Sequence, residues 1–403
     1  GGVNGTLSGD LFTGSEFNSG SATHSLSWSE VGIVDLNATL SDGSYMANGP
    51  QVRGTAPDVG RFVPDHFRIT NSTAASFCNA CFVGAFTYIG QPFYYDNAPI
   101  VTLSAQNAQN GTTQNYDGAF WKFGNQTDYL DARNYTDQAN ASAFLEASLL
   151  DNATATDPTD FDGSWKFSLE GNDCYSNSTD GDEFRYQKNG TESPFIAKAN
   201  LNLSQTDLTD QDGICYQANG SCLGYTIENI TGTELRYGRL ILENAYGSEL
   251  LDLKVPVRAQ YYDGNGFSLN EEEQCTQLTI GNGTDIVEME LKKESGDWQS
   301  ANQTIELSGR KSSGTTRGIA LRNAADSATT LDLDQGRAFL VLEAPGEDNT
   351  GYVHVKANLE DHPWLQHDWS GNGNHTDNPN ATATFGIYKG NEHIIYQQET
   401  TWK

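Results

Sequence analysis

The sequence has no long apolar run: no stretch approaches the 18 consecutive apolar residues typical of a membrane-spanning helix. Basic residues are also scarce, since 23 Lys and Arg stand against 53 Asp and Glu, for a formal net charge of −30. Nucleic acids and anionic lipids both require a basic surface, so we expect neither as a partner. A negative charge of this size keeps the protein surface hydrated and separate from other surfaces of the same sign.

The familiar hydrolase and nucleotide-binding motifs are missing as well. The chain contains no G-x-S-x-G, no H-E-x-x-H and no phosphate-binding loop. Carboxylates are so frequent in this chain that two of them close together in the sequence are no evidence of an acid/base catalytic pair. We expect the run Glu271, Glu272 and Glu273 to be a solvated turn. We therefore expect no enzymatic activity. An enzyme acting on polysaccharide would need a cleft with two facing carboxylates.

What the chain does contain favours β-structure. Hydrophobic residues make up 36% of the sequence and include 7 Trp, 18 Tyr and 18 Phe, while 41 Gly interrupt it at short intervals. Aromatic and β-branched segments separated by such turn residues are typical of short strands joined by tight turns. We predict an all-β fold made of tandem immunoglobulin-like β-sandwich domains with long decorated loops.

The composition divides the chain into three parts. Residues 1–58 begin Gly/Ser-rich and contain strand candidates, and this segment could donate a strand to a neighbouring molecule. Residues 59–234 are expected to form a β-sandwich region with long polar insertions, and residues 235–403 a C-terminal β-sandwich region. We interpret residues 124–163 as one decorated insertion, in which Ala141–Leu150 has helical spacing.

The strongest pair of strand candidates comprises Leu235–Asn244 and Leu250–Tyr262. Pro256 lies inside the second run, and a proline cannot donate to the hydrogen-bond ladder of a sheet. The sequence therefore predicts that this strand lies at a sheet edge or contains a bulge.

Asn-x-Thr/Ser sequons are the most informative motif. The chain has 17, where composition alone would give roughly five, and 14 of them end in Thr. An N-linked glycan is bulky and hydrated, so each modified asparagine must face solvent. The sequence therefore predicts an exported glycoprotein, located outside the cell, on its surface or in a surface appendage, and coated with covalent N-linked glycans. The predicted sites are Asn4, Asn37, Asn71, Asn110, Asn125, Asn134, Asn140, Asn152, Asn177, Asn189, Asn202, Asn219, Asn229, Asn282, Asn302, Asn374 and Asn380.

Six cysteines agree with an extracellular location, because an even number in an acidic, sequon-rich chain is typical of disulfides. Spacing favours the local pairs Cys78–Cys81 and Cys215–Cys222, which leaves Cys174 to pair with Cys275, although six cysteines allow other pairings. Alternatively, the first pair could be a redox motif or half of a zinc site. A redox motif would be followed by a helix, whereas the next residues predict a strand, and no second C-x-x-C completes a zinc site.

Residues 368–374 (D-W-S-G-N-G-N) resemble the opening of a calcium loop. Oxygen-bearing side chains stand at Asp368, Ser370 and Asn372, where alternate residues point toward one centre, and a glycine follows for the sharp turn. The match is partial, because the twelfth position is Pro379 and not Glu. The segment thus predicts either a calcium site, which is the only cofactor that the sequence suggests, or a plain Gly/Asn turn.

Histidines and aromatic residues near the same segment offer weaker signals. His354, His362, His367 and His375 cluster in the sequence, but their spacing fits no zinc pattern, so turn or surface positions are expected. Exposed aromatic rings could stack on sugars, although core packing is their commoner role. The rings in question belong to Tyr261, Tyr262, Trp364 and Trp369.

Five blocks of the sequence resemble a known family. Residues 59–67 (VGRFVPDHF) and 86–93 (FTYIGQPF) look like the start of the large uncharacterised domain at the C-terminal end of MshQ-type proteins. Residues 235–251 (LRYGRLILENAYGSELL) are similar to its central block, and residues 363–369 (PWLQHDW) and 383–396 (ATFGIYKGNEHIIY) to its terminal signature. The blocks occur in the family's order, and the resemblance covers roughly residues 30–403.

MshQ-type proteins belong to mannose-sensitive haemagglutinin pilus systems. The resemblance therefore implies a β-rich, pilus-associated surface protein with a structural or adhesive role, and it implies no catalytic residues. We expect a non-enzymatic extracellular glycoprotein that serves as a structural subunit of a pilus-like or other surface filament, with copies of itself as partners. The alternative is a cell-surface adhesin that binds glycans.

Overall fold

The computed structural model describes most of the chain, and almost every element in it is a strand. The described residues are 2–9, 13–41, 49–72, 75–123, 134–139, 141–148, 154–156, 162–168, 182–280, 288–300, 305–309, 318–319, 321–323 and 330–386. Within these ranges the helical elements are three short 3-10 turns, η1 (Gly14–Glu16), η2 (Gly118–Phe120) and η3 (Pro363–Leu365). The predicted all-β fold is confirmed, and this part of the chain has no helix with the length and apolar character that a bilayer crossing requires.

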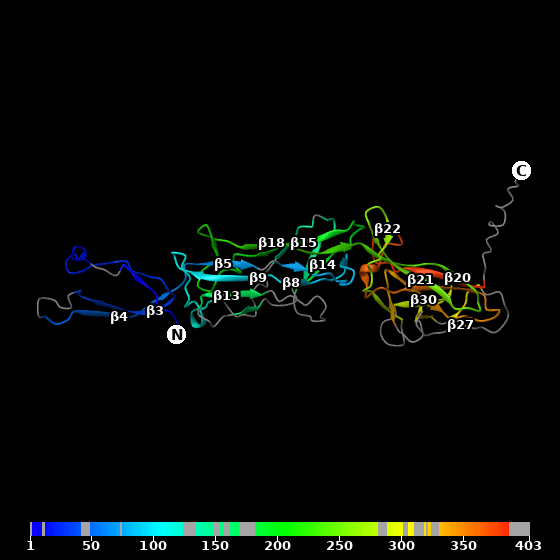
Figure 1. Ribbon diagram of the computed structural model, residues 1–403, viewed down its shortest axis with the longest axis horizontal. Helices are drawn as coiled ribbons and strands as arrows, with labels where there is room; N and C mark the ends of the chain where they lie inside the picture. The colour runs from blue at the N-terminus through cyan, green and yellow to red at the C-terminus, as the bar shows by residue number, and fades with distance from the viewer. Residues whose placement is uncertain are drawn as a thin grey trace.

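The molecule is elongated, and its parts follow one another along the long axis in the order of the sequence (Figure 1). A two-stranded ribbon of β3 (Gly32–Thr39) and β4 (Arg53–Phe62) projects at one end. Two β-sandwiches follow, which we call the proximal and the distal sandwich by their distance from the ribbon. A further short pair joins β1 (Leu7–Ser8) to β2 (Ser27–Trp28).

Over the residues that the structure describes, the proximal sandwich contains two sheets and two short strand pairs. Its first sheet has the order β10 (Asn134–Asp137), β15 (Phe195–Leu203), β18 (Tyr225–Arg236), β6 (Ser76–Phe77) and β8 (Tyr95–Asn97), and β7 (Phe86–Tyr88) also pairs with β18. Its second sheet has the order β12 (Thr154–Thr156), β13 (Ser164–Ser168), β9 (Ile100–Gln106) and β5 (His66–Ser72). The short pairs are β11 (Leu145–Ser148) with β14 (Glu183–Tyr186), and β16 (Gln217–Ala218) with β17 (Ser221–Cys222).

The core of the proximal sandwich is largely aromatic. Along β15 buried residues alternate with partly exposed ones, and Ala199 and Leu201 are fully buried, as period-two patterning requires for a sheet with one inner face. The ring of Phe77 lies 5.3 Å from that of Phe93 and 4.8 Å from that of Phe184, measured between centroids. Such rings bury large apolar areas and also gain from edge-to-face contact, so they hold the two sheets together.

The distal sandwich is built in the same way. Its first sheet has the order β19 (Gly238–Leu242), β21 (Leu253–Tyr262), β30 (Arg337–Leu342) and β28 (Leu321–Asn323), and β22 (Phe267–Leu269) also pairs with β21. Its second sheet has the order β20 (Ala245–Gly247), β32 (Asn380–Phe385), β31 (Gly351–Ala357), β24 (Met289–Lys292) and β25 (Gln299–Ser300). Short pairs join β23 (Gln277–Thr279) to β29 (Thr330–Asp332), and β26 (Ile305–Glu306) to β27 (Gly318–Ile319).

The position of Pro256 corrects a prediction. The strand β21 that contains it lies between β19 and β30 in the described sheet, so it is an inner strand with regular register and not an edge strand or a bulge. The ladder to β19 ends at the pair of Leu242 and Val257, and the Pro256 carbonyl accepts the next backbone N–H, that of Glu243, at 3.0 Å. The nitrogen of Pro256 faces the same side, beyond the end of β19, so the missing donor breaks no ladder bond.

The helical spacing predicted for residues 141–150 does not produce a helix over 141–148, the part that the structure describes. Residues Leu145–Ser148 form β11, which pairs with β14 so that Leu145 stands opposite Tyr186. Phe144 and Glu146 are exposed while Leu145 and Ala147 are half-buried, which is the alternation of a strand. Pairing with a neighbouring strand therefore prevails over a short local pattern.

The beginning of the chain is held against the proximal sandwich. The backbone N–H of Val3 donates to Asn115 Oδ1 at 2.7 Å, and Asn115 Nδ2 donates back to the Val3 carbonyl at 2.9 Å. The buried carboxylate of Glu30 accepts the backbone N–H groups of Val31, Gln114 and Asn115. The two ends of this leading segment are thus anchored at the proximal sandwich, and the stretch between them extends toward the same end of the molecule as the ribbon (Figure 1).

Candidate functional site

The two sandwiches meet at a junction where the chain passes from β18 into β19 through Tyr237. There β7 runs parallel to the end of β18, with Phe86 opposite Glu234 and Tyr88 opposite Arg236. The side chains of Phe86 and Tyr88 belong to the core of the distal sandwich, although the segment that carries them is part of the proximal sheet. One hydrophobic core therefore contains residues from both halves of the molecule.

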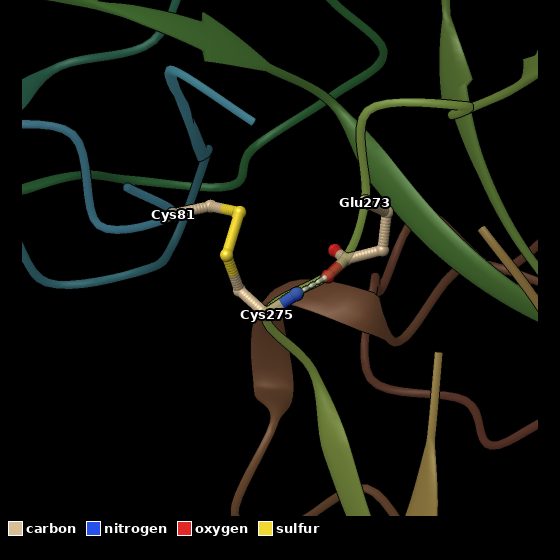
Figure 2. Close-up of side chains that lie close together, drawn as sticks. All are labelled: Cys81, Glu273 and Cys275. Atoms are coloured by element: carbon tan, nitrogen blue, oxygen red, sulfur yellow. Dashed lines mark hydrogen bonds between the residues drawn. A yellow bond between two sulfur atoms is a disulfide. The ribbon is translucent and has the colours of Figure 1, made fainter. Parts of the chain in front are cut away.

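A disulfide crosses this junction. Cys81, just before β7, is bonded to Cys275, just before β23, with 5.5 Å between their Cα atoms and 194 positions between them in the sequence (Figure 2). In the chain-entropy description, a cross-link that closes so long a loop stabilises the folded state by roughly 5 kcal/mol. The bond is therefore a covalent tie between segments that the fold brings together from far apart.

This bond corrects the predicted pairing of the cysteines. Cys81 does not pair with Cys78, and Cys275 does not pair with Cys174, because Cys81 is buried in the distal core beside Phe86, where Cys275 meets it. The predicted pair of Cys215 and Cys222 is confirmed across the β16–β17 hairpin, with a Cα separation of 5.6 Å. Cys78 is buried, and Cys174 lies outside the described residues.

Glu273 supports the turn that presents Cys275. Its side chain is fully buried, and its Oε1 accepts the backbone N–H groups of Cys275 and Thr276, both at 2.8 Å (Figure 2). The expectation of a solvated acidic turn is therefore wrong for Glu273, while Glu271 and Glu272 are exposed. The carboxylate acts here as a local cap, which replaces backbone acceptors that the turn lacks.

The same three side chains also form the one group in the described part that could in principle hold a metal. The ligand atoms of Cys81, Glu273 and Cys275 lie within 4.8 Å of one another. The two sulfurs are bonded to each other, however, and the thiolate is the form of cysteine that binds a metal. In this oxidised state the arrangement is a covalent clamp and not a metal centre.

Arg236 fills the space between the two halves next to the disulfide. Its Nε donates to Glu234 Oε1 at 2.7 Å, a second nitrogen donates to Asn270 Oδ1 at 2.8 Å, and the third pairs with Glu272. The guanidinium lies over the ring of Phe86, 4.8 Å from its centroid. Burial opposes the charge, but the two carboxylates outweigh it, so the pKa of Arg236 is raised and the cation is retained.

Lys188 ties the proximal sandwich to the backbone of the distal one. Its Nζ donates to the carbonyls of Gly238, Trp364 and Gln366 at 2.7, 2.6 and 2.5 Å. It also lies 4.5 Å from the centroid of the Tyr237 ring, within the range of a cation–π contact. Burial lowers the pKa of the Lys188 ammonium well below its usual value, because leaving water disfavours the charged form.

Two histidines converge on Tyr237 beside this lysine. The Tyr237 hydroxyl lies 2.8 Å from Nδ1 of His367 and 2.7 Å from Nδ1 of His375. Burial and, to a smaller extent, the neighbouring Arg239 and Lys188 together lower the pKa of His367 to about 4. Burial and Lys188 also lower the pKa of His375. At neutral pH both rings are therefore uncharged, which suits a hydroxyl that can donate to one ring and accept from the other.

The remaining two histidines of the predicted cluster lie elsewhere. His354 Nδ1 contacts Thr382 Oγ1 at 3.2 Å, and His362 Nε2 pairs with Glu288 at 2.8 Å. The spacing in the sequence therefore brings together only His367 and His375, and the cationic Arg239 and Lys188 beside them disfavour a bound metal cation.

The predicted calcium loop is a tight turn in the structure. Asp368 accepts the backbone N–H groups of Asn372 and Gly373, both at 2.9 Å, and these bonds lower the pKa of its carboxyl. The Ser370 hydroxyl lies 3.5 Å from Asp368, and Asn372 Oδ1 accepts the N–H of Asn374 at 2.7 Å. These oxygens thus face amide hydrogens, as in an Asx turn. Calcium binding here stays a prediction.

The sequons lie where glycans could be attached. Among the sequon asparagines whose side chains are described, the exposed ones are Asn4, Asn37, Asn110, Asn134, Asn189, Asn219, Asn229, Asn374 and Asn380. Asn202 is half-buried, and its Nδ2 donates to Thr136 Oγ1 at 2.7 Å. Asn71 lies in β5, and Asn125, Asn140, Asn152, Asn177, Asn282 and Asn302 lie outside the described residues. Glycosylation itself stays a prediction, and the exposed positions meet its geometric condition.

Sequence patterns alone did not identify Lys188, Arg236 or Tyr237 as residues of a site. One signal could have found the junction, because three of the five blocks on which the resemblance rests meet there. Residues 86–93 supply Tyr88, residues 235–251 supply Arg236 and Tyr237, and residues 363–369 supply the carbonyls that Lys188 contacts.

The comparison with family descriptions finds two consecutive domains of one family. DUF6701, third domain, matches residues 30–228, and DUF6701, fourth domain, matches residues 236–400. The boundary between the two matches falls within β18, at the junction. No curated protein matches the chain.

Among solved structures, the adhesin InvE of Yersinia pseudotuberculosis is similar to 79% of this chain, with 12% sequence identity and a TM-score of 0.21. The chain spans 60% of the length of that adhesin. A likeness this distant supports no conclusion about function. The two family matches, by contrast, extend over nearly the whole sequence, and the chain therefore belongs to the DUF6701 family, of which it carries the third and fourth domains.

Proposed function

We propose that the chain is a non-enzymatic structural element of the cell exterior, a sugar-coated rod that serves as a subunit of a surface filament. The observation that carries this proposal is the junction. Domains within one chain normally move relative to each other unless their interface is large and apolar. Here the interface shares one core, and the Cys81–Cys275 bond crosses it. A rod that transmits force along its length requires such a joint.

The surface of the molecule supports an exterior location. Disulfides persist in oxidising compartments, and the described residues contain two. The exposed sequon asparagines extend from Asn4 in the N-terminal segment to Asn380 in the distal sandwich. A coat of hydrated glycans over an acidic surface would resist proteolysis and non-specific contact.

The resemblance to MshQ-type proteins supports the more specific assignment to a pilus-like filament. It is carried by sequence blocks that include residues 86–93, 235–251 and 363–369, which are the blocks that build the junction. In a protein of a pilus system, a junction that fixes two sandwiches to each other fits a structural role better than a catalytic one.

Electron microscopy tests this proposal. The purified, glycosylated full chain is imaged at rising concentration, and native cell-surface material is imaged beside it. We expect straight rods that join into linear assemblies, with a fixed angle between the two sandwiches. The double variant Cys81→Ala/Cys275→Ala should give rods with a variable angle. Isolated molecules at every concentration and on the native surface would contradict the structural role.

A second candidate function is the binding of glycans, and one observation favours it. The ring of Trp369 is 42% exposed, and the Arg239 guanidinium lies 5.0 Å from its centroid and 3.4 Å from that of Phe267. An exposed ring beside a donor-rich cation is a surface on which a sugar could stack. Binding on a glycan array that Trp369→Ala abolishes, while Tyr246→Ala at another exposed ring leaves it intact, would support this candidate; equal binding by both variants would refute it.

A further inference from the structure

The sequons are unevenly distributed, and one sheet of the distal sandwich lies entirely between them. Two intervals between successive sequon asparagines are longer than all others, residues 230–281 and residues 303–373. Strands β19, β21 and β22 fall in the first interval, and β28 and β30 fall in the second. These five strands make up the first sheet of the distal sandwich. A glycan on any sequon of the chain is therefore attached outside this sheet.

The charge is uneven in the same place. The five strands contain no Asp or Glu, although the chain has 53, and they contain five of its 23 Lys and Arg. These five are Arg239, Lys254, Arg258, Arg322 and Arg337. In the first sheet of the proximal sandwich, by contrast, β18 alone contains Glu228, Glu234 and the sequon Asn229. The distal sheet is thus a basic, sequon-free exception in an acidic molecule that is rich in sequons.

Basic side chains lie on the outer face of this sheet. Val255 on β21 is fully buried, so the residues that alternate with it along the strand point away from the core. Directly opposite residues share a face, which places Phe339 beside Pro256 and Arg337 beside Arg258. We call these outward residues the basic face: Lys254, Pro256, Arg258, Arg337 and Phe339.

The cations of the basic face are open to a ligand. Lys254 is exposed, and among the described residues no carboxylate pairs with it. Arg258 pairs with Glu243 at 3.2 Å, and Arg337 pairs with Glu271 at 3.4 Å. All four side chains of these pairs are well exposed to solvent, and such surface pairs contribute little to stability. An anionic group of a ligand can therefore replace either carboxylate at small cost.

The net charge of the molecule does not prevent an anion from binding at this face. Salt screens exposed charges over about 8 Å at physiological ionic strength, so a ligand responds mainly to the groups near it. Lys254 and Arg258 stand on the same side of β21, roughly 13 Å apart at the rise of a β-strand. Arg239, opposite Gln260 on the neighbouring strand, continues the row toward the junction. An extended ligand with repeated anionic groups can therefore contact several cations at once.

We propose that the basic face binds an anionic polysaccharide, that is, a sugar chain with carboxylate or sulfate groups. The ring of Phe339 is 44% exposed, and Lys254 Nζ lies 5.8 Å from its centroid. A sugar ring can stack its apolar side on this aromatic ring while its acidic group meets a lysine or an arginine. The inference is independent of the filament, and it names a ligand class and a further surface for the glycan binding that is the second candidate function.

Two other kinds of anionic ligand fit the face less well. Nucleic acids need a densely basic surface that neutralises many phosphates, whereas the cations here are few and are separated by Pro256 and Phe339. Acidic peptides are usually held at a sheet edge or in a groove, where the backbone or a pocket contributes contacts. β21 and β30 are inner strands of the described sheet, so the basic face offers side chains only. A flat face with an aromatic ring among separated cations therefore suits a sugar chain best.

Binding of the purified, glycosylated full chain to immobilised polysaccharides tests the proposal. Polygalacturonate supplies carboxylates, dextran sulfate supplies sulfates, and dextran is the neutral control. The variant Lys254→Glu/Arg258→Glu reverses two charges on the basic face. Its matched control, Lys122→Glu/Lys293→Glu, makes the same change in net charge at two lysines outside the face. Biolayer interferometry at about 150 mM salt measures the dissociation constants.

We expect the unaltered chain and the control to bind at least one of the two anionic polysaccharides and not dextran. The Lys254→Glu/Arg258→Glu variant should raise the apparent dissociation constant by about 10-fold or more, because two attractive charges become repulsive. Phe339→Ala should raise it by about 3- to 10-fold through the loss of stacking. Phe144→Ala, at a 65% exposed ring of the proximal sandwich, should leave it unchanged. Thermal unfolding verifies that each variant is folded.

Three results would overturn the proposal. The first is that the unaltered chain binds neither anionic polysaccharide. The second is that the Lys254→Glu/Arg258→Glu variant binds as well as the unaltered chain, or that its control loses binding to the same extent. The third is equal or tighter binding to single-stranded DNA or polyglutamate, immobilised in the same way, which would assign the face to another kind of partner. None of these results bears on the filament, which electron microscopy tests separately.

Discussion

The ammonium of Lys188 in the proximal sandwich donates a hydrogen bond to the Trp364 carbonyl of the distal sandwich, 2.6 Å away and 176 residues later in the chain. Two further carbonyls, those of Gly238 and Gln366, complete its contacts. One side chain thus satisfies three backbone acceptors that belong to the other half of the molecule. The relationship makes Lys188 a direct probe of how firmly the two halves are joined.

Replacing Lys188 with methionine should destabilise the junction. Methionine keeps the unbranched apolar stem of the side chain but leaves three carbonyls without their donor, so the free energy of unfolding is expected to fall by about 2–4 kcal/mol. Denaturant unfolding followed by tryptophan fluorescence measures this. Lys122→Met is the control, because that ammonium contacts a single exposed carbonyl, of Ala119, and its loss should change stability by less than about 0.5 kcal/mol. Equal effects of the two substitutions would contradict the role of Lys188.

The two described disulfides should differ in their contribution to stability. The chain-entropy description assigns roughly 5 kcal/mol to the Cys81–Cys275 bond, which closes 194 positions, and roughly 2 kcal/mol to the Cys215–Cys222 bond, which closes 7. Cys81→Ala/Cys275→Ala should therefore lower the unfolding temperature more than Cys215→Ala/Cys222→Ala does. Calorimetry measures the unfolding temperature of both double variants. A larger decrease on removal of the Cys215–Cys222 bond than of the Cys81–Cys275 bond would contradict the predicted order.

Gly238 should tolerate no side chain. A Cβ at this position would lie 2.3 Å from the ring of Tyr88, which is buried where the two halves share a core. Gly238→Ala is expected to cost about 1–3 kcal/mol through overpacking. Gly190→Ala is the matched control, since no atom lies within 4 Å of its Cβ position. Thermal unfolding of the two variants should separate them; if both match the unaltered chain, the contact between β7 and β19 is looser than described.

Acid should weaken the junction through His367. Its folded-state pKa is about 4, below the value of 6.5 for an unperturbed histidine, so the unfolded chain binds more protons between these values. Stability is therefore lost as the pH falls from about 6.5 toward 4, by roughly 2 kcal/mol after allowance for solvent screening of a half-buried group. Denaturant unfolding at pH 7 and pH 4.5 measures the loss.

The variant His367→Gln isolates this contribution, because carboxyl groups elsewhere titrate in the same way in both proteins. The difference in stability between the unaltered chain and the variant should shrink as the pH falls through this window. A difference that stays constant from pH 7 to pH 4.5 would show that His367 takes up no proton there.

Much of the fold followed from local pattern. The predicted strands Leu235–Asn244 and Leu250–Tyr262 contain β19 and β21, which pair with each other, and buried residues alternate along β21, as a sheet with one inner face requires. The prediction for Pro256 was wrong because the effect of a missing N–H depends on whether a neighbouring strand lies opposite it. Where β19 ends is set by the tertiary fold and cannot be seen in the local sequence. The strand at Leu145–Ser148 depends in the same way on its partner β14.

The junction could not be derived from spacing. Cys81 and Cys275 are neighbours only because β7 pairs with β18 and its aromatic residues enter the distal core. Glu273 is buried for the same reason, since the turn that it caps lies against that core. Local rules treat nearby cysteines as partners and acidic runs as solvated, and both rules fail where two halves of a chain share a core.

One sequon should differ from the others in occupancy. The Nδ2 of Asn202, the atom that would carry a glycan, donates to Thr136 Oγ1 and to the carbonyl of Asn134, while its Oδ1 accepts from Thr226. A glycan would break these bonds across β10, β15 and β18. We expect Asn202 to be modified far less often than the exposed Asn134 opposite it. Quantitative glycopeptide analysis compares the two, and full occupancy of Asn202 would contradict the expectation.

The central claim is that carbohydrate covers the outside of this molecule, and a site-by-site glycopeptide map of the chain from its native source tests it most directly. The account predicts glycans on most of the nine exposed sequon asparagines, from Asn4 to Asn380. A map in which most of these asparagines are unmodified would contradict it.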